Sequence, residues 1–240
     1  MRTGGEGKRL PLQTGRAVSG PETQIIGVIQ VKGGVGRSTI ATNLAALFSL
    51  TQQTALIDCD LPQGTSASWY AVRTAEMPSD NLTLATAGDY RELVSRAQEL
   101  SKTHRYLVID APPRIAGMTR AIVVMSTLCL VPLGASAAEI WSTADLVKTL
   151  DAAREFRADI DARIVWNRYR GNTREALDVS EAARKELGLK ELAARLGYRV
   201  AYSEALARGL STVEWLDRSA HAEIQTLADE VQGILREKRK

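Results

Sequence analysis

Residues 32–39 combine the chemical groups that a phosphate-binding loop needs. The segment follows a short apolar run and precedes an apolar-periodic one. Glycines allow close approach that a Cβ would block, and successive backbone N–H groups can wrap a polyphosphate. The N-terminus of a following helix adds partial positive charge. A turn without a ligand is the alternative, but we predict a nucleotide-phosphate loop made of Lys32, Gly33, Gly34, Val35, Gly36, Arg37, Ser38 and Thr39.

Three aspartates stand where apolar runs end. Asp58 and Asp60 follow residues 54–57, and Asp110 follows residues 106–109. Open α/β sheets bind ligands outside the carboxyl ends of their strands, so these carboxylates are expected beside the loop. Oxygen ligands suit Mg²⁺, and we predict that Ser38 and Asp110 hold it, directly or through its water shell. The alternatives are acidic turn residues at 58 and 60 and a simple helix cap at 110.

The periodicity of the chain indicates the elements that must position these residues. An almost unbroken apolar run at 25–31 suits a central parallel strand covered on both faces. Further strands are predicted at 54–57, 82–85, 106–109, 127–133 and 163–166. Helical spacing predicts helices at 38–50, 90–104, 118–125, 138–156, 173–187 and 221–236, and one that begins within 66–73. The expected fold class is α/β, with a mostly parallel, doubly wound sheet and helices on both faces.

Composition excludes several other classes of protein. The 240 residues are 45% hydrophobic and 25% charged, which are ordinary globular values, and a net charge of +3 does not by itself predict nucleic-acid binding. Cys59 and Cys129 lack metal-ligand spacing, and His104 and His221 are isolated, so no zinc or histidine-based catalytic site is indicated. No apolar run approaches the roughly 18 residues that span a bilayer.

The first residues differ in composition from the rest of the chain. Residues 1–23 are basic and rich in Gly, Pro, Ser and Thr. We predict a flexible basic tail at 1–23, followed by one domain at 24–240. The tail is either a solvated leader or a weak contact with DNA or a partner.

The motifs also resemble those of a known family. The loop departs from the usual G-x-x-x-x-G-K-[ST] pattern, because Val31 replaces the first glycine, Arg37 replaces the lysine, and Lys32 is an extra lysine. This arrangement resembles the deviant Walker A motif of ParA/MinD-type P-loop ATPases. Residues 58–64, 110–113 and 199–205 resemble the family's D-x-D-P-Q-G, D-x-P-P and R-x-x-Y-x-x-A segments. The resemblance runs from about residue 24 to about residue 231.

The resemblance implies roles for individual residues. The cofactors would be ATP or ADP with Mg²⁺, and ATP would bridge two monomers in a sandwich homodimer. Lys32 would cross to the partner's phosphates, Asp60 would orient the attacking water, and Asp58 would support the water and the metal. Asn167, after the predicted strand 163–166, would contact adenine; a turn-forming asparagine is the alternative.

The resemblance also implies a function and partners. The chain is similar to the short ParA-like partition proteins, which segregate plasmids or chromosomes or position other cargo. The ATP-bound dimer would bind DNA non-specifically through surface Lys and Arg, and a ParB-like or cargo-adaptor protein would stimulate hydrolysis. A cytoplasmic, nucleoid-associated protein without a membrane partner is expected.

Two departures from the family pattern bear on hydrolysis. Arg37 is a planar fork where the family has a compact lysine charge. Leu61 is inserted before Pro-Gln-Gly, so either the loop bulges by one residue or Asp60 is displaced. Phosphoryl transfer depends on positioning and charge, so both changes affect hydrolysis more than binding.

Three hypotheses follow. The first is a slow ParA-like partition ATPase, and the second is a nucleotide-binding scaffold of the same fold with weak or no hydrolysis because of Arg37. The third is a metabolic or maturation P-loop enzyme. The absence of a C-x-x-C pair argues against a metal-cluster carrier.

Overall fold

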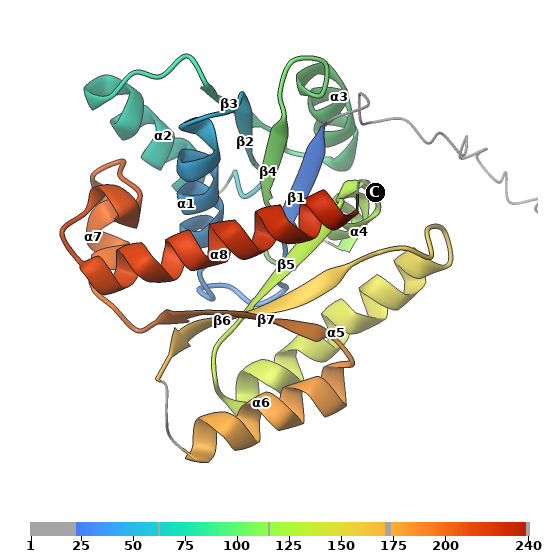
Figure 1. Ribbon diagram of the computed structural model, residues 1–240. Coiled ribbons are helices and arrows are strands. Elements are labelled where there is room, and N and C mark those ends of the chain that lie inside the picture. The colour runs from blue at the N-terminus through green and yellow to red at the C-terminus, as the bar shows by residue number, and fades with distance from the viewer. Residues whose placement is uncertain (1–22, 62, 115, 171–173, 239–240) are drawn as a thin grey trace, which may run out of the picture.

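The computed structural model describes residues 23–61, 63–114, 116–170 and 174–238 (Figure 1). Strands and helices alternate along these residues. The strands are β1 (Gln24–Val28), β2 (Thr54–Asp58), β3 (Leu82–Thr86), β4 (Tyr106–Asp110), β5 (Leu128–Leu133), β6 (Ala162–Tyr169) and β7 (Lys190–Gly197). The helices are α1 (Arg37–Ser49), α2 (Thr65–Glu76), α3 (Tyr90–Leu100), α4 (Ala116–Met125), α5 (Ala137–Arg154), α6 (Arg174–Leu187), α7 (Ala201–Ala207) and α8 (Arg218–Glu237), with a short 3₁₀ turn, Thr212–Glu214.

The described strands form one seven-stranded parallel sheet in the order β3-β2-β4-β1-β5-β6-β7. The register places Asp110 of β4 level with both Asp58 of β2 and Val28 of β1. The loops that follow these three strands therefore meet at one edge of the sheet, where open α/β folds bind ligands.

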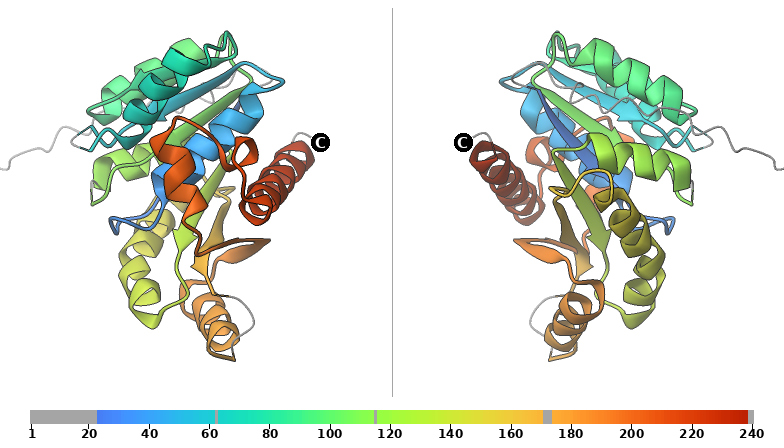
Figure 2. Two further views of the ribbon diagram at one scale, coloured as in Figure 1. Left: turned by 90° about the vertical axis from the view of Figure 1, so that its left-hand side faces the viewer. Right: turned by 90° about the vertical axis from the view of Figure 1, so that its right-hand side faces the viewer.

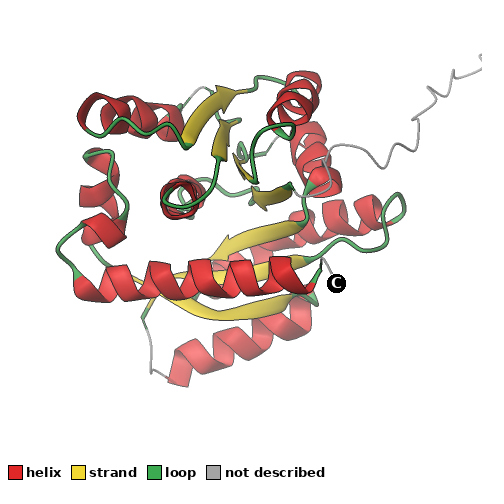
Figure 3. Cartoon of the chain, turned by 45° about the horizontal axis from the view of Figure 1, so that its top comes forward, coloured by secondary structure: helices red, strands yellow, loops and turns green. Residues whose placement is uncertain are grey.

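Two hydrophobic cores sandwich the sheet. Helices α1, α2, α7 and α8 cover one face, and α3, α4, α5 and α6 cover the other (Figure 2). Successive residues of β1 serve opposite cores, because Ile25 packs into one and Ile26 into the other. A view tilted so that the top of the molecule comes forward also shows helices on both sides of the strands (Figure 3). The predicted doubly wound α/β class is confirmed.

Several element boundaries differ from the prediction. The strand predicted at 163–166 extends to Tyr169, and the helix predicted at 90–104 ends at Leu100. The last helix begins at Arg218 instead of 221, because the Asp217 side chain accepts hydrogen bonds from the Ser219 and Ala220 N–H groups.

Two elements, β7 and α7, are not among those predicted. In β7 the buried residues do alternate, but alanines at 193 and 194 weaken the apolar signal. Its pairing with β6 is irregular, and the N–H groups of Ala193 and Ala194 donate to Glu230 of α8 instead. This edge strand depends on a helix far along the chain, which local periodicity does not show.

The remaining expectations concern the tail, the cysteines and membranes. Residues 1–22 of the predicted tail lie outside the described residues, whereas Thr23 is buried and donates to the carbonyls of Ser101 and His104. Cys59 and Cys129 are buried free thiols, as their apolar context predicts. In the part of the chain that the structure describes, no helix has the length and apolar character needed to cross a bilayer.

Candidate nucleotide-binding site

The predicted loop connects β1 to α1 at the carboxyl edge of the sheet. Gly34 and Gly36 have φ angles of 75° and 94°, in the left-handed region that glycine adopts without strain. Gly36 is the N-cap of α1, and no side chain among the described residues caps this helix. The first N–H groups of α1, around Ser38 and Thr39, are therefore open to an anion. The strand–loop–helix arrangement predicted from the sequence is confirmed.

Asn167 of β6 braces this loop. Its side chain is buried, its Nδ2 donates to the Val35 carbonyl at 2.7 Å, and its Oδ1 accepts from the Arg168 N–H at 2.9 Å. A Cβ on Gly36 would collide with that Nδ2. Asn167 thus touches the loop directly; its contact with adenine stays a prediction.

Arg37 points into the protein rather than away from it. Its Nε donates to the Ala111 carbonyl at 2.8 Å, and its Nη1 donates to the carbonyls of Gln30 and Lys32 at 2.9 and 2.5 Å. Its Nη2 lies 3.8 Å from Oδ2 of Asp60. Burial lowers the pKa of the guanidinium, while the carboxylates of Asp110 and Asp60 raise it. An arginine so partnered remains charged.

Asp110 ends β4 with one oxygen satisfied and one open. Ser66 of α2 donates to its Oδ2 at 2.7 Å, whereas its buried Oδ1 has no hydrogen-bond partner among the described residues. Burial raises the pKa of Asp110 to about 6, while the nearby Ser38 hydroxyl and the hydrogen bond from Ser66 oppose that rise. A buried carboxylate oxygen without a partner, beside the Ser38 hydroxyl, fits a hard cation such as Mg²⁺.

The described part of the chain offers few direct ligands for that cation. The described residues contain no group of three or more His, Cys, Asp or Glu side chains that could hold a metal ion. Mg²⁺ usually keeps several waters and binds through one or two protein ligands together with phosphate oxygens. Ser38 and Asp110 are the residues that would hold it.

Asp58 and Asp60 shape the loop between β2 and α2. Asp58 is fully buried and accepts from the N–H groups of Asp60 and Ala67, both at 2.9 Å. Both of its oxygens therefore fix the backbone, and its role toward the metal stays a prediction. Burial raises the pKa of Asp60, Arg37 lowers it, and Asp58 raises it further; the net shift is upward.

The inserted Leu61 lies in the turn that follows Asp60. Its side chain is 45% exposed, and the Asp60 carbonyl accepts from the N–H groups of Gln63 and Gly64. Asp60 lies beside Arg37, and the choice between a bulged loop and a displaced Asp60 stays a prediction.

Lys32 lies at the mouth of the loop. Its side chain is 40% exposed, and its Nζ is 3.5 Å from Oε1 of Glu139 in α5. Glu139 is itself fixed, because its Oε2 accepts from the Gly134 N–H at 2.5 Å. Lys32 is paired within its own chain but remains accessible, and its contact across a dimer stays a prediction.

Sequence reasoning missed Gln30, Ser66 and Glu139. The sequence did mark Gln30, because it is a polar residue within the apolar run 25–31. Its Nε2 donates to Thr143 and to the Pro132 carbonyl. Ser66 and Glu139 had none, since their contacts join separate elements of the chain.

The late R-x-x-Y-x-x-A segment contributes to packing in this structure. Arg199 and Tyr202 both bond to Glu223 of α8, at 2.7–2.9 Å. The Gly197 N–H donates to the same carboxylate at 2.9 Å. The segment therefore fastens the end of β7 to α8.

A comparison with known families agrees with this site. The model of the CobQ/CobB/MinD/ParA nucleotide binding domain matches residues 26–213. The chain belongs to this family. The predicted ParA/MinD-type P-loop ATPase family is thereby confirmed.

Individual relatives cover nearly the whole chain. The chain is 31% identical over 215 residues to the maintenance of carboxysome distribution protein A of Gloeobacter kilaueensis, covering 87% of this chain and 94% of that one. It is 29% identical over 245 residues to the chromosome-partitioning ATPase Soj of Thermus thermophilus, covering 88% and 96%. Its fold matches an ATP complex of McdA from Cyanothece with a TM-score of 0.74 at 16% identity, covering 89% and 98%.

Proposed function

We propose that this ParA/MinD-family protein is an ATP-dependent positioning ATPase. It forms an ATP-sandwich homodimer, binds DNA non-specifically in that form, and segregates a plasmid or chromosome or positions another cargo. One observation carries the proposal: the phosphate loop, the open oxygen of Asp110 and the accessible Lys32 lie at one edge of the sheet. The similarity to a carboxysome-distribution protein and to a chromosome-partitioning ATPase supports positioning over small-molecule metabolism.

The residues of the site divide the chemistry among them. The N–H groups of the loop and of the first turn of α1 bind the nucleotide phosphates. Ser38 and Asp110 would hold Mg²⁺, which supplies neutralisation of phosphate charge when bound. Asp60 orients the attacking water, and Lys32 leaves Glu139 to reach the second monomer's nucleotide.

DNA binding follows from the dimer. A dimer doubles the number of Lys and Arg side chains on one particle, and non-specific binding rests on neutralising phosphates. Affinity for DNA should therefore require ATP and fall steeply with salt. A ParB-like or cargo-adaptor partner would stimulate hydrolysis and return the protein to monomers.

Sedimentation tests the dimer. With ATP and Mg²⁺ the wild type should sediment as a dimer and with ADP as a monomer, and Lys32→Ala should stay monomeric in both. Lys148→Ala is the matched control, because Lys148 of α5 is likewise paired with a carboxylate, Asp145 of the same helix, and is 78% exposed. ATP-dependent dimers of Lys32→Ala would remove the cross-dimer role. DNA retention that is equal with and without nucleotide would remove the switch.

A second function is favoured by the position of Arg37. Three of its donors are bound to protein carbonyls, which suits a nucleotide-binding scaffold with weak or no hydrolysis. Steady-state ATP hydrolysis with Mg²⁺ and DNA separates the two. Clear turnover by the wild type supports the ATPase, whereas turnover gained only by Arg37→Lys supports the scaffold.

A further inference from the structure

The partners of Arg37 account for most of its hydrogen-bonding capacity. A guanidinium has five N–H donors. The Nε–H and the two Nη1 donors are directed at the carbonyls of Ala111, Gln30 and Lys32, and Nη2 faces Asp60. The side chain is 6% exposed. Its donors are therefore already assigned before any nucleotide arrives.

These acceptors come from three separate loops. Gln30 and Lys32 follow β1, Ala111 follows β4, and Asp60 follows β2. From them we infer that Arg37 is a positioning residue that ties the loops after β1, β2 and β4 together, and that it serves protein acceptors rather than the nucleotide phosphates. This inference rests on the proposed nucleotide site and refines the role of one residue in it.

The acceptors are themselves fixed, so the arginine has a rigid frame to join. The Ala111 N–H donates to the Val28 carbonyl at 3.1 Å, and the Gln30 side chain is anchored on Thr143 at 2.9 Å. The backbone of Asp60 is bonded as well, because its N–H donates to Asp58 and its carbonyl accepts from Gln63 and Gly64, whereas its carboxylate meets Arg37 in a single 3.8 Å contact. Arg37 therefore faces the carboxylate expected to orient water from a fixed frame, through a loose contact.

Lysine could not make the same set of contacts. Its ammonium is one compact nitrogen, whereas the planar fork presents three nitrogens in fixed directions. The three donors of one ammonium nitrogen cannot serve the four acceptors that the guanidinium reaches from three separate nitrogens. The arginine in this loop is thus more than a replacement charge for the family's lysine.

Hydrogen exchange in the nucleotide-free protein tests the positioning role. The amides to follow are those of Gln63 and Gly64, which donate to the Asp60 carbonyl, and of Ala111. Arg37→Gln and Arg37→Lys should each exchange about tenfold faster at both places, because the three loops lose their common partner. Asp60→Asn leaves the bonds from Arg37 to the backbone carbonyls intact. It should therefore speed amide exchange only within residues 59–64. Wild-type exchange in both Arg37 variants would overturn the inference.

Affinity for Mg²⁺-ADP, measured by calorimetry on the same variants, gives the second readout. A positioning residue predicts that Arg37→Gln weakens ADP binding by less than about tenfold. Loss of two charge-assisted phosphate contacts would instead cost about a hundredfold or more, and Arg37→Lys would restore it. That result would overturn the inference. If the wild type bound no nucleotide, the proposed function would be wrong, but the exchange result would still test the positioning role of Arg37.

Discussion

Arg37 and Arg73 are both 6% exposed, yet they hold their carboxylates differently. Arg73 of α2 binds Glu214 through two parallel bonds of 2.8 and 2.9 Å, donates to the Gly209 carbonyl at 3.0 Å, and lies over the Trp69 ring. Arg37 makes carbonyl bonds of similar length, but its carboxylate is 3.8 Å away. The tight pair joins two segments through a bidentate bond, whereas the loose pair leaves the Asp60 carboxylate able to take another partner.

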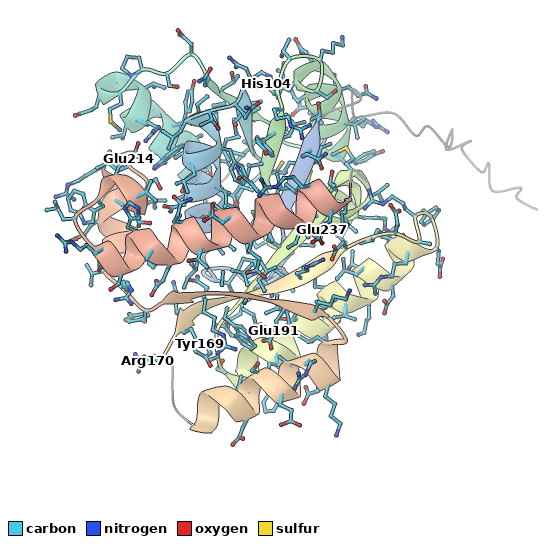
Figure 4. All side chains as sticks on the ribbon, in the orientation of Figure 1. His104, Tyr169, Arg170, Glu191, Glu214 and Glu237 are labelled. Carbon is cyan, nitrogen blue, oxygen red and sulfur yellow. The ribbon has the colours of Figure 1, made fainter. Side chains whose placement is uncertain are left out.

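The two regions are connected through α2. Glu214 lies on the side of the molecule where α2 and α7 meet (Figure 4). The Trp69 Nε1–H donates to the Leu210 carbonyl, so a second side chain of α2 fastens the same segment. At the start of α2, Ser66 bonds to Asp110 and the Ala67 N–H bonds to Asp58. The contact of residues 209–214 with α2 therefore supports a site in which the Asp110 and Asp60 carboxylates still have unfilled hydrogen-bonding capacity.

Gly209→Ala should break the rigid region most severely. Gly209 has a φ of 67°, and a Cβ there would lie 2.7 Å from the Cα of Arg73, which is backbone that cannot rotate away. Left-handed strain and overpacking together should cost about 4 kcal/mol of unfolding free energy. Gly188→Ala is the matched control, with φ 62° and nothing within 4 Å, and should cost about 1 kcal/mol. Equal urea midpoints for the two variants would contradict this.

Arg73→Ala tests the tight pair itself. It leaves the Glu214 carboxylate and the Gly209 carbonyl without their donor in a largely buried place. Breaking such a pair costs about 3 kcal/mol, measured as the free energy of unfolding in urea. Arg73→Lys should recover only part of it, because one nitrogen cannot reproduce the two-pronged bond. If Arg73→Ala unfolds like the wild type, the two arginines are equivalent and the comparison fails.

Asp110→Asn should have opposite effects on stability and binding. The amide removes a buried charge whose Oδ1 has no partner, so the nucleotide-free protein should gain about 1 kcal/mol. The Mg²⁺-dependent part of ADP affinity should fall about tenfold or more, since the expected metal ligand is lost. Thermal melting and calorimetry with and without Mg²⁺ measure the two effects. A destabilised apoprotein, or unchanged Mg²⁺ dependence, would contradict the assignment of Asp110.

The sequence predicted those parts of the site that depend on local chain order. The glycine loop, Ser38 and the aspartates at strand ends are each specified by a few consecutive residues, and parallel strands then bring them to one edge. The same logic predicted the doubly wound sheet. It failed for β7, whose alternation rests on small alanines and whose N–H groups depend on Glu230.

Contacts between distant segments were not predictable in this way. Ser66 reaches Asp110 across 44 positions, and Asn43 accepts from Ser211 across 168. The direction of the Arg37 side chain is a further example, because the motif places the residue but packing decides that it turns toward Ala111. Such choices follow from how the helices pack against the sheet, which no short pattern encodes.

The two carboxylates that face the buried arginines should give opposite pH dependences. Burial raises the pKa of Glu214, but hydrogen bonds from Arg73 and the Ser211 N–H outweigh it, so the net pKa is lowered. Its stabilising contribution is present above the unfolded value of 4.5 and is lost as pH falls through the folded value. The pKa of Asp60 is raised, chiefly by burial, so its contribution grows as pH falls.

The size of both effects should be below about 1 kcal/mol, because both groups are partly solvated. Urea midpoints at pH 7 and pH 4 measure them against matched amide variants. Glu214→Gln should lose less stability on acidification than the wild type, whereas Asp60→Asn should lose more, since it lacks the carboxyl that gains from protonation. If both variants changed the stability lost between pH 7 and pH 4 in the same direction, the loose and the tight pair would respond to pH alike. The distinction between the two arginines would then rest on geometry alone.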